Sequence, residues 1–322
     1  VLFATASLLA FWRLINGGRW FWWVMHALLT GLAFHLHYYI VWVVLVQNLY
    51  FLVGLWRVHG HIFRRGAWRE LRWWILDQLV VLAFAAPALG IFLTYMFGRN
   101  QWSWLEASYR PPRLAELVNL LVAYTTGTIF VGPVLVRRLV ALAFVGLAAW
   151  GIWHVYRKAP LSGRALGLMM LAVGLPVALI FVLGQFSTLW VMRYLLVFLC
   201  PFLVLVALGM SALLSSVLRV SAVGLVAVIS LVALSRMYAV PQKEDWRGVA
   251  AYVAAQAGET DLIVLMDEDC RVPFNYYYGA VGSRVEVSRF ADAAALDKAV
   301  AEILARQHGG RVWLVVSHAD SA

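Results

Sequence analysis

Residues 165–184 read ALGLMMLAVGLPVALIFVLG, an apolar run without a single charged side chain. A helix needs about 20 such residues to cross the roughly 30 Å of hydrocarbon in a bilayer. The run is therefore predicted to span a membrane. Seven more apolar runs share this character and lie at Val1–Trp12, Trp20–Leu36, Tyr38–Trp56, Trp73–Phe97, Leu139–Tyr156, Tyr194–Leu213 and Val220–Tyr238.

The composition of the whole chain agrees with these runs. Hydrophobic residues make up 63% of the 322 residues, and the mean hydropathy is +0.81. Soluble domains are nearer half apolar. The sequence thus predicts a polytopic α-helical membrane protein with about eight hydrophobic segments. Its opening within an apolar run, without an initiator methionine or a signal peptide, favours a fragment that lacks upstream membrane segments.

The composition changes near Pro241. Residues 239–322 contain 8 of the 26 Lys and Arg residues but 12 of the 16 Asp and Glu residues. Hydrophobic periodicity in this tail predicts helices at 244–256 and 293–307 and short strands at 262–266, 284–287 and 311–316. We therefore expect residues 1–238 to form the transmembrane domain and residues 239–322 a small soluble α/β domain.

The net charge of +10 belongs to the membrane part. A high pI can indicate nucleic-acid binding, but these basic residues lie in short loops between apolar runs, where they orient a membrane protein. With the basic loops in the cytoplasm, the remaining loops and the C-terminal domain become extracytoplasmic. The chain is thus expected to be a multi-pass membrane protein with its C-terminal domain outside the cytoplasm. Residues 114–136 then form an amphipathic helix along the outer interface.

Arg193 is the sharpest candidate for a functional residue. It stands at the outer start of a long apolar run, within Trp190-Val191-Met192-Arg193-Tyr194, and has no acidic residue within ten positions. An unpaired guanidinium at headgroup level suits a bidentate contact with a phosphate. The alternative is an ordinary anchor that snorkels toward the headgroups.

His35, His37 and Tyr38 form a second candidate site, at the outer turn between two runs. In an extended turn, side chains two positions apart point the same way. Both imidazoles would then face one cavity and contact a phosphate or shuttle a proton. The alternative is a polar hairpin tip. Two histidines alone make no metal site, so no cofactor is identified and a divalent metal has no support.

Other polar residues have structural explanations. Asp77 is expected to pair with an arginine of the preceding basic loop. Glu106 and Glu116, the acidic residues of the long outer segment, are expected to be solvated. The string Glu244-Asp245-Trp246-Arg247 is expected to cap a helix and to dock Trp246 onto the membrane domain.

Three stretches together resemble a known family. Gly31-Leu32-Ala33-Phe34-His35-Leu36-His37-Tyr38-Tyr39 is similar to a turn of bacterial glycosyltransferases with the GT-C fold. Arg193-Tyr194-Leu195-Leu196, followed by Pro201-Phe202, resembles one of their spans, and Glu244-Asp245-Trp246-Arg247-Gly248 resembles the opening of their C-terminal domain. The family comprises dolichyl-phosphate-mannose–protein mannosyltransferase relatives (glycosyltransferase family 39-like), including aminoarabinose transferases.

The resemblance implies an enzyme of the bacterial inner membrane. It moves a sugar from a polyprenyl-phosphate carrier to an extracytoplasmic acceptor, which is a lipid, a glycan or a protein. It implies a donor-phosphate site at Arg193, Tyr194, His37 and Tyr38. His35 stands where the family more often has an apolar residue. The catalytic carboxylate is implied in an outer loop upstream of residue 1, so this chain alone is expected to lack it.

Two other functions remain open from the sequence. A transporter or flippase of a lipid-linked saccharide should carry charges near the membrane midplane or broken helices in paired repeats, whereas here the polar residues gather at the outer interface. A non-catalytic membrane scaffold for the soluble domain should lack a basic outer site. The sugar, the acceptor and the oligomeric state are not determined by these patterns.

Overall fold

A computed structural model describes residues 1–60, 64–97, 110–127, 133–158, 163–239, 244–258, 260–265, 268–279, 284–287, 301–302 and 309–316. The chain divides into two compact units, Val1–Arg236 and Met237–Ala322, close to the expected boundary at residue 238. We call them the helical unit and the C-terminal unit. Each has a hydrophobic core of its own.

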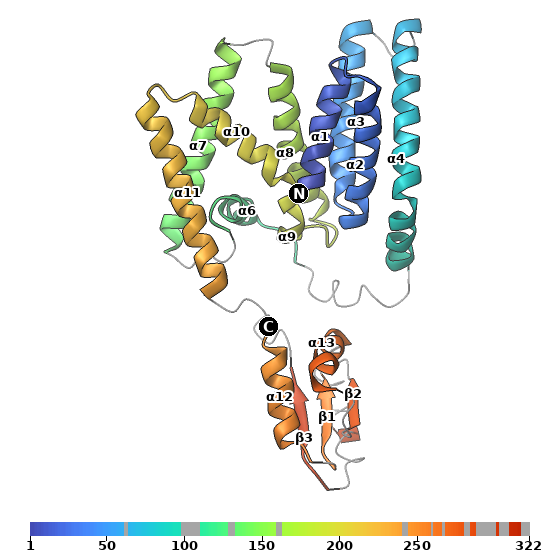
Figure 1. The fold of residues 1–322 in the computed structure, drawn as a ribbon, viewed down its shortest axis with the longest axis vertical. Helices are drawn as coiled ribbons and strands as arrows, with labels where there is room; N and C mark the ends of the chain where they lie inside the picture. Colours follow the sequence, from blue (N-terminus) through green and yellow to red (C-terminus); the bar gives the residue numbers. More distant parts are fainter. Residues whose placement is uncertain are drawn as a thin grey trace. The chain divides into compact units, whose positions relative to one another are not determined.

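The helical unit is a bundle of apolar helices (Figure 1). Its elements are α1 (Leu2–Ile15), α2 (Trp20–Leu36), α3 (Ile40–His59), α4 (Arg65–Phe97), α6 (Leu114–Thr126), α7 (Val134–Lys158), α8 (Gly163–Leu183), α9 (Met192–Leu195), the 3-10 helix η2 (Leu196–Phe198), α10 (Leu199–Ser211) and α11 (Ser216–Ala239). All the predicted apolar runs fall on helices.

Six segments of the described residues are long and apolar enough to cross a membrane. They are α3, α4, α7, α8, the continuous segment Met192–Ser211 that contains α9 to α10, and α11. The helical membrane architecture predicted from the sequence is thus confirmed in outline. With 14 residues in α1 and 17 in α2, the count of eight crossings stays a prediction.

Connections between the long helices gather at two opposite ends of the helical unit. Figure 1 shows the α1–α2 turn, the end of α3 and the start of α4 at one end, and the α2–α3 turn with α9 at the other. α6 runs across the direction of α7 and α8 in the same view. Its 13 residues reach about 20 Å, too short for a crossing. Gly127, with φ of 74°, ends it, so residues 114–136 are not one continuous helix.

Two glycines set the crossing of α7 and α10. A Cβ atom on Gly209 would lie 1.8 Å from the carbonyl oxygen of Leu147, and one on Gly151 would lie 2.4 Å from the amide nitrogen of Gly209. Small residues let helix backbones approach closely in membranes, where helix association depends on van der Waals packing rather than on the hydrophobic effect. The two helices therefore meet backbone to backbone.

Pro201 explains why α9 is separate from α10. A proline has no N–H group and cannot donate to the carbonyl four residues earlier, here that of Val197. The chain forms the 3-10 turn η2 at this point before α10 continues. The short helix α9, which carries Arg193 and Tyr194, is thereby set apart from the long span that follows.

A polar network lies inside α1 to α4. His26 Nδ1 is 2.7 Å from Asp77 Oδ2, and both side chains are buried. Gln78 donates to the same carboxylate oxygen at 3.1 Å. The prediction that Asp77 pairs with a loop arginine was wrong, because Asp77 faces α2 within the bundle rather than the basic loop.

The C-terminal unit is an α/β structure, as predicted. It contains α12 (Trp246–Gln256), β1 (Leu262–Leu265), α13 (Glu268–Tyr278), β2 (Arg284–Val287) and β3 (Val312–Val315). The sheet order is β2-β1-β3, and both outer strands run parallel to the buried β1. The predicted helix at 293–307 lies outside the described residues except for 301–302, which are helical.

The string Glu244-Asp245-Trp246-Arg247-Gly248 has a local role. The Asp245 side chain caps α12 by accepting a hydrogen bond from the amide of Gly248 at 2.8 Å. A Cβ atom at Gly248 would lie 2.2 Å from Asp245 Oδ2, so glycine lets the carboxylate approach. Trp246 packs against the core of the C-terminal unit itself.

The glycine contact between α7 and α10 predicts a position-specific loss of stability. Gly151→Leu should destabilise the helical unit by at least the roughly 1–3 kcal/mol typical of overpacking, since its added atoms meet backbone. Gly146→Leu on the same helix should leave the stability unchanged, because nothing lies within 4 Å of a Cβ atom added at Gly146. Thermal unfolding in detergent, followed by fluorescence size-exclusion chromatography, compares them. Equal melting temperatures for both variants would refute the proposed crossing.

Candidate functional site

The structure brings the two predicted candidate stretches together. The ring of His37, in the α2–α3 turn, lies 4.6 Å from the ring of Tyr194 on α9. The ring of Tyr38 lies 5.6 Å and that of Tyr39 5.2 Å from the same Tyr194. We call these four residues the aromatic cluster. Its parts come from positions more than 150 residues apart in the chain.

Arg193 adds a cation at the edge of the aromatic cluster. Its Cζ lies 5.1 Å from the centroid of the Tyr194 ring, within range of a cation–π interaction. Its Nη2 is 3.4 Å from the Tyr194 hydroxyl, a long hydrogen bond. The side chain is exposed, and among the described residues no carboxylate forms an ion pair with it. The guanidinium is thus available to an anion.

Two tyrosine hydroxyls hold the segment that carries Arg193. The Tyr39 hydroxyl donates to the carbonyl of Leu189, just before α9. The Tyr124 hydroxyl on α6 donates to the carbonyl of Leu195 at 2.5 Å. Both tyrosines are buried. Sequence reasoning missed them as supports, although Tyr39 follows the predicted His37-Tyr38 pair directly.

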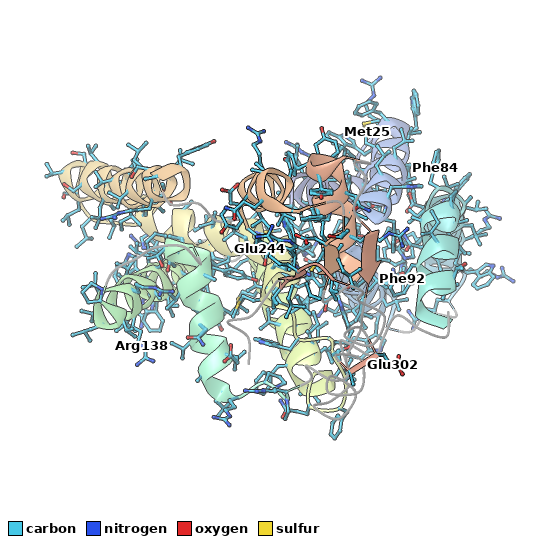
Figure 2. All side chains as sticks on the ribbon, turned by 90° about the horizontal axis from the view of Figure 1, so that it is seen from below. Met25, Phe84, Phe92, Arg138, Glu244 and Glu302 are labelled. Carbon is cyan, nitrogen blue, oxygen red and sulfur yellow. The ribbon has the colours of Figure 1, made fainter. Side chains whose placement is uncertain are left out.

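His35 does not join the aromatic cluster. It belongs to the last turn of α2, and its Nε2 donates to the carbonyl of Phe84 on α4 at 2.8 Å. This hydrogen bond joins the end of α2 to α4 one turn before Pro87. Phe92 of α4 does reach the aromatic cluster and stacks on Tyr38, with the ring centroids 4.8 Å apart. Figure 2 labels both phenylalanines on α4.

The electrostatics of the aromatic cluster favour neutral hydrogen-bond donors beside a permanent cation. Burial lowers the pKa of His37 below its ordinary value of 6.5, and the positive charge of Arg193 lowers it further. Burial, followed by the neighbouring Tyr194, raises the pKa of Tyr38 and of Tyr39. At neutral pH the site therefore presents a neutral imidazole, protonated phenols and one guanidinium.

This combination suits a phosphate group. A guanidinium offers a planar fork of donors to phosphate oxygens, and phenol and imidazole groups add further donors. Within the described part of the chain, no three His, Cys, Asp or Glu side chains are placed to hold a metal ion. Of the outer acidic residues, Glu116 on α6 accepts a weak hydrogen bond from Asn119 at 3.4 Å. Glu106 lies outside the described residues.

Comparison with known proteins gives no family assignment. The chain matches no protein-family model, no curated protein and no solved structure. Its function must therefore be inferred from its own residues and their arrangement.

The charge beside His37 predicts how this histidine titrates. Its titration midpoint should lie below pH 6.5. Arg193→Gln removes a repulsive positive charge, which stabilises the imidazolium, so the midpoint should rise toward 6.5 without reaching it, because burial remains. NMR of histidine-labelled protein, with His37→Asn to assign the signal, measures both. Arg138→Gln is the control and should leave the midpoint unchanged. A wild-type midpoint above 6.5 would contradict this electrostatic account.

Proposed function

We propose that this protein is a membrane glycosyltransferase that moves a sugar from a polyprenyl-phosphate carrier to an extracytoplasmic acceptor. The observation that supports this most is the meeting of the α2–α3 turn with α9, which puts His37 and Tyr38 beside Arg193 and Tyr194. These are the residues for which the resemblance implies a donor-phosphate site. Their proximity was not required by the local pattern of either stretch.

The proposed chemistry fits a lipid-linked donor. A polyprenyl phosphate has its phosphate at headgroup level, and α9 lies at the end of a membrane-length segment. Cationic and neutral donors that stabilise charge on the departing phosphate make it a better leaving group. Arg193 would bind the phosphate through its planar fork, while Tyr38, Tyr194 and His37 would orient it. The bond to the sugar carbon then breaks with the electrons passing to the phosphate oxygen.

An acceptor hydroxyl also needs a base, normally a carboxylate. We assign this role to no described residue. Asp77 is buried against His26, and Glu116, half-buried on α6, accepts a hydrogen bond from Asn119.

One observation favours the alternative of a transporter or flippase. The His26–Asp77 pair lies buried in the bundle, linked through Gln78 to Asn48. Ionisable groups at membrane depth are expensive and often mark ion or proton pathways. A donor with a radiolabelled sugar distinguishes the two functions. A transferase yields labelled acceptor and free polyprenyl phosphate, whereas a flippase leaves the donor chemically intact on the opposite leaflet.

Donor binding by Arg193 variants tests the proposed phosphate site. A charge-assisted hydrogen bond contributes roughly 1.5–3 kcal/mol, so Arg193→Ala should weaken polyprenyl-phosphate binding at least tenfold. Arg193→Lys keeps the charge but loses the fork, so it should be intermediate. Native mass spectrometry of the purified protein with polyprenyl phosphate gives the affinities.

Arg113→Ala is the matched control, because Arg113 is an exposed arginine that precedes α6 and makes no side-chain cap. It should bind the donor like the wild type. If Lys behaves as wild type and Ala falls by less than twofold, Arg193 is only a membrane anchor and the phosphate site is wrong.

Membrane topology offers a test that does not depend on activity. With Cys200 and Cys270 replaced by alanine, Ser187→Cys, between α8 and α9, should react with an impermeant thiol reagent in intact cells. Ser215→Cys, between α10 and α11, should react only after permeabilisation. Basic residues gather near the end of the bundle where Ser215 lies, and such residues favour the cytoplasmic side of a membrane. The reverse pattern would place the aromatic cluster in the cytoplasm and exclude the proposed orientation.

A further inference from the structure

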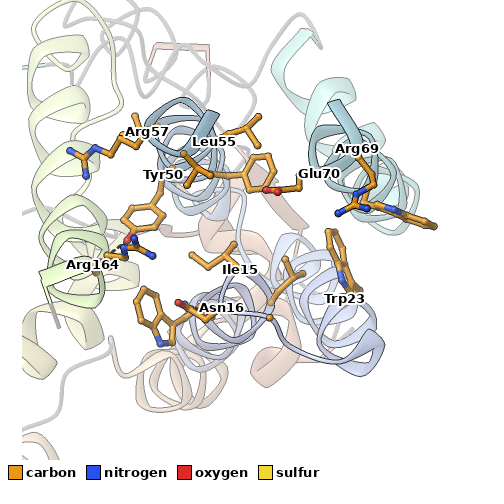
Figure 3. A pocket seen from close by; sticks show the side chains of 17 residues that line it. Ile15, Asn16, Trp23, Tyr50, Leu55, Arg57, Arg69, Glu70 and Arg164 are labelled. Atoms are coloured by element: carbon orange, nitrogen blue, oxygen red, sulfur yellow. Dashed lines mark hydrogen bonds between the residues drawn. The ribbon is translucent and has the colours of Figure 1, made fainter. Parts of the chain in front are cut away.

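A second feature lies at the opposite end of the helical unit from the aromatic cluster. It is a cavity of about 510 Å³ between α1, α2, α3, α4 and the start of α8 (Figure 3). The cavity contains none of the residues of the proposed phosphate site. Whatever binds here is independent of the proposed function.

The charged residues of this cavity are mostly positive. Figure 3 shows Arg57 of α3 and Arg164 of α8 on one side, near Tyr50, and Arg69 of α4 on the other side. Glu70 is the one carboxylate in the lining, which gives the cavity a net charge of +2. The excess of positive charge favours an anionic ligand over a zwitterionic one.

These arginines have no anionic partner among the described residues. Glu70 itself pairs with His59, whose Nε2 lies 3.3 Å from Glu70 Oε1. The neighbouring connections at 61–63 and 159–162 contain no Asp or Glu in the sequence, so they offer no carboxylate either. The guanidinium groups are exposed and remain available to a ligand from outside the chain.

The remaining walls of the cavity are apolar and aromatic. Trp12 and Trp23 come from α1 and α2, and Phe51 and Trp73 from α3 and α4. Three of these rings are only partly buried by the protein, and Trp73 is exposed. An amphiphile with an anionic head and an apolar tail matches both parts, whereas a free inorganic anion would leave the aromatic walls without a partner.

We propose that this cavity binds an anionic phospholipid of the leaflet that faces the basic loops. Arg57 and Arg164 hold the headgroup phosphate, and the first part of the acyl chains lies against the aromatic walls. Basic pockets between transmembrane helices on the cytoplasmic side are suited to anionic headgroups. Because the Tyr50 hydroxyl donates to the Arg164 carbonyl at 2.7 Å, the lipid would reinforce an existing junction between α3 and α8.

Native mass spectrometry of the purified full chain tests this site, with phosphatidylglycerol, phosphatidylcholine and inorganic phosphate as separate probes. Phosphatidylglycerol should bind at least tenfold more tightly than phosphatidylcholine, and millimolar phosphate should not displace it. The triple variant Arg57→Gln, Arg69→Gln, Arg164→Gln should lose at least tenfold in phosphatidylglycerol affinity. A matched triple variant, Arg157→Gln, Lys158→Gln, Arg219→Gln, removes the same charge outside the cavity and should bind like the wild type.

Three outcomes would overturn the proposal. Equal binding of both lipids would show no headgroup selection, displacement by phosphate would show a simple anion site, and equal losses in both triple variants would show a general surface-charge effect. Should the first triple variant fail to fold, the Arg→Lys triple keeps the charge and serves instead. It should lose less than tenfold yet bind more weakly than the wild type, because lysine lacks the planar fork. Unchanged affinity in the Lys variant would exclude specific guanidinium contacts.

Discussion

Hydrocarbon offers no hydrogen-bonding partner to a peptide group, and the rest of this structure depends on that constraint. A backbone in lipid must satisfy its N–H and C=O groups internally, which selects helices. The same constraint explains why polar side chains of the bundle pair with one another, as Ser7 does with Thr30 at 2.6 Å and Gln47 with Ser7 at 2.9 Å.

Much of this fold could be predicted from the sequence, because long apolar runs and alternating strands are local patterns. The helices α2 and α3 and the strand β1 fall where these patterns predict them, whereas α4 begins at Arg65 and includes the end of the expected basic loop before Trp73. α13 was not predicted, since Pro273 interrupts its pattern and its side chains are mixed in polarity. Where a local pattern of apolar residues determines a helix or strand, one sequence is sufficient to predict that element.

The candidate site could be predicted only in its parts. Arg193 and His37 each stood out by type and position, but the contact of His37 with Tyr194, the neighbour of Arg193, depends on how α9 packs against the α2–α3 turn, which no periodicity encodes. Asp77 shows the same limit, because its partner depends on which helix face meets α2. Tyr124 supports α9 from a helix that carries no functional signature at all.

The hydrogen bonds from Tyr39 and Tyr124 that hold α9 have a consequence for biogenesis. Each hydroxyl comes from an element synthesised earlier than α9, and neither contact is local. The short helix α9, which carries Arg193, can therefore adopt its final geometry only once Tyr39 and α6 are in place to receive it. Both supports leave the ribosome before α9, so the guanidinium is positioned by partners that are already synthesised.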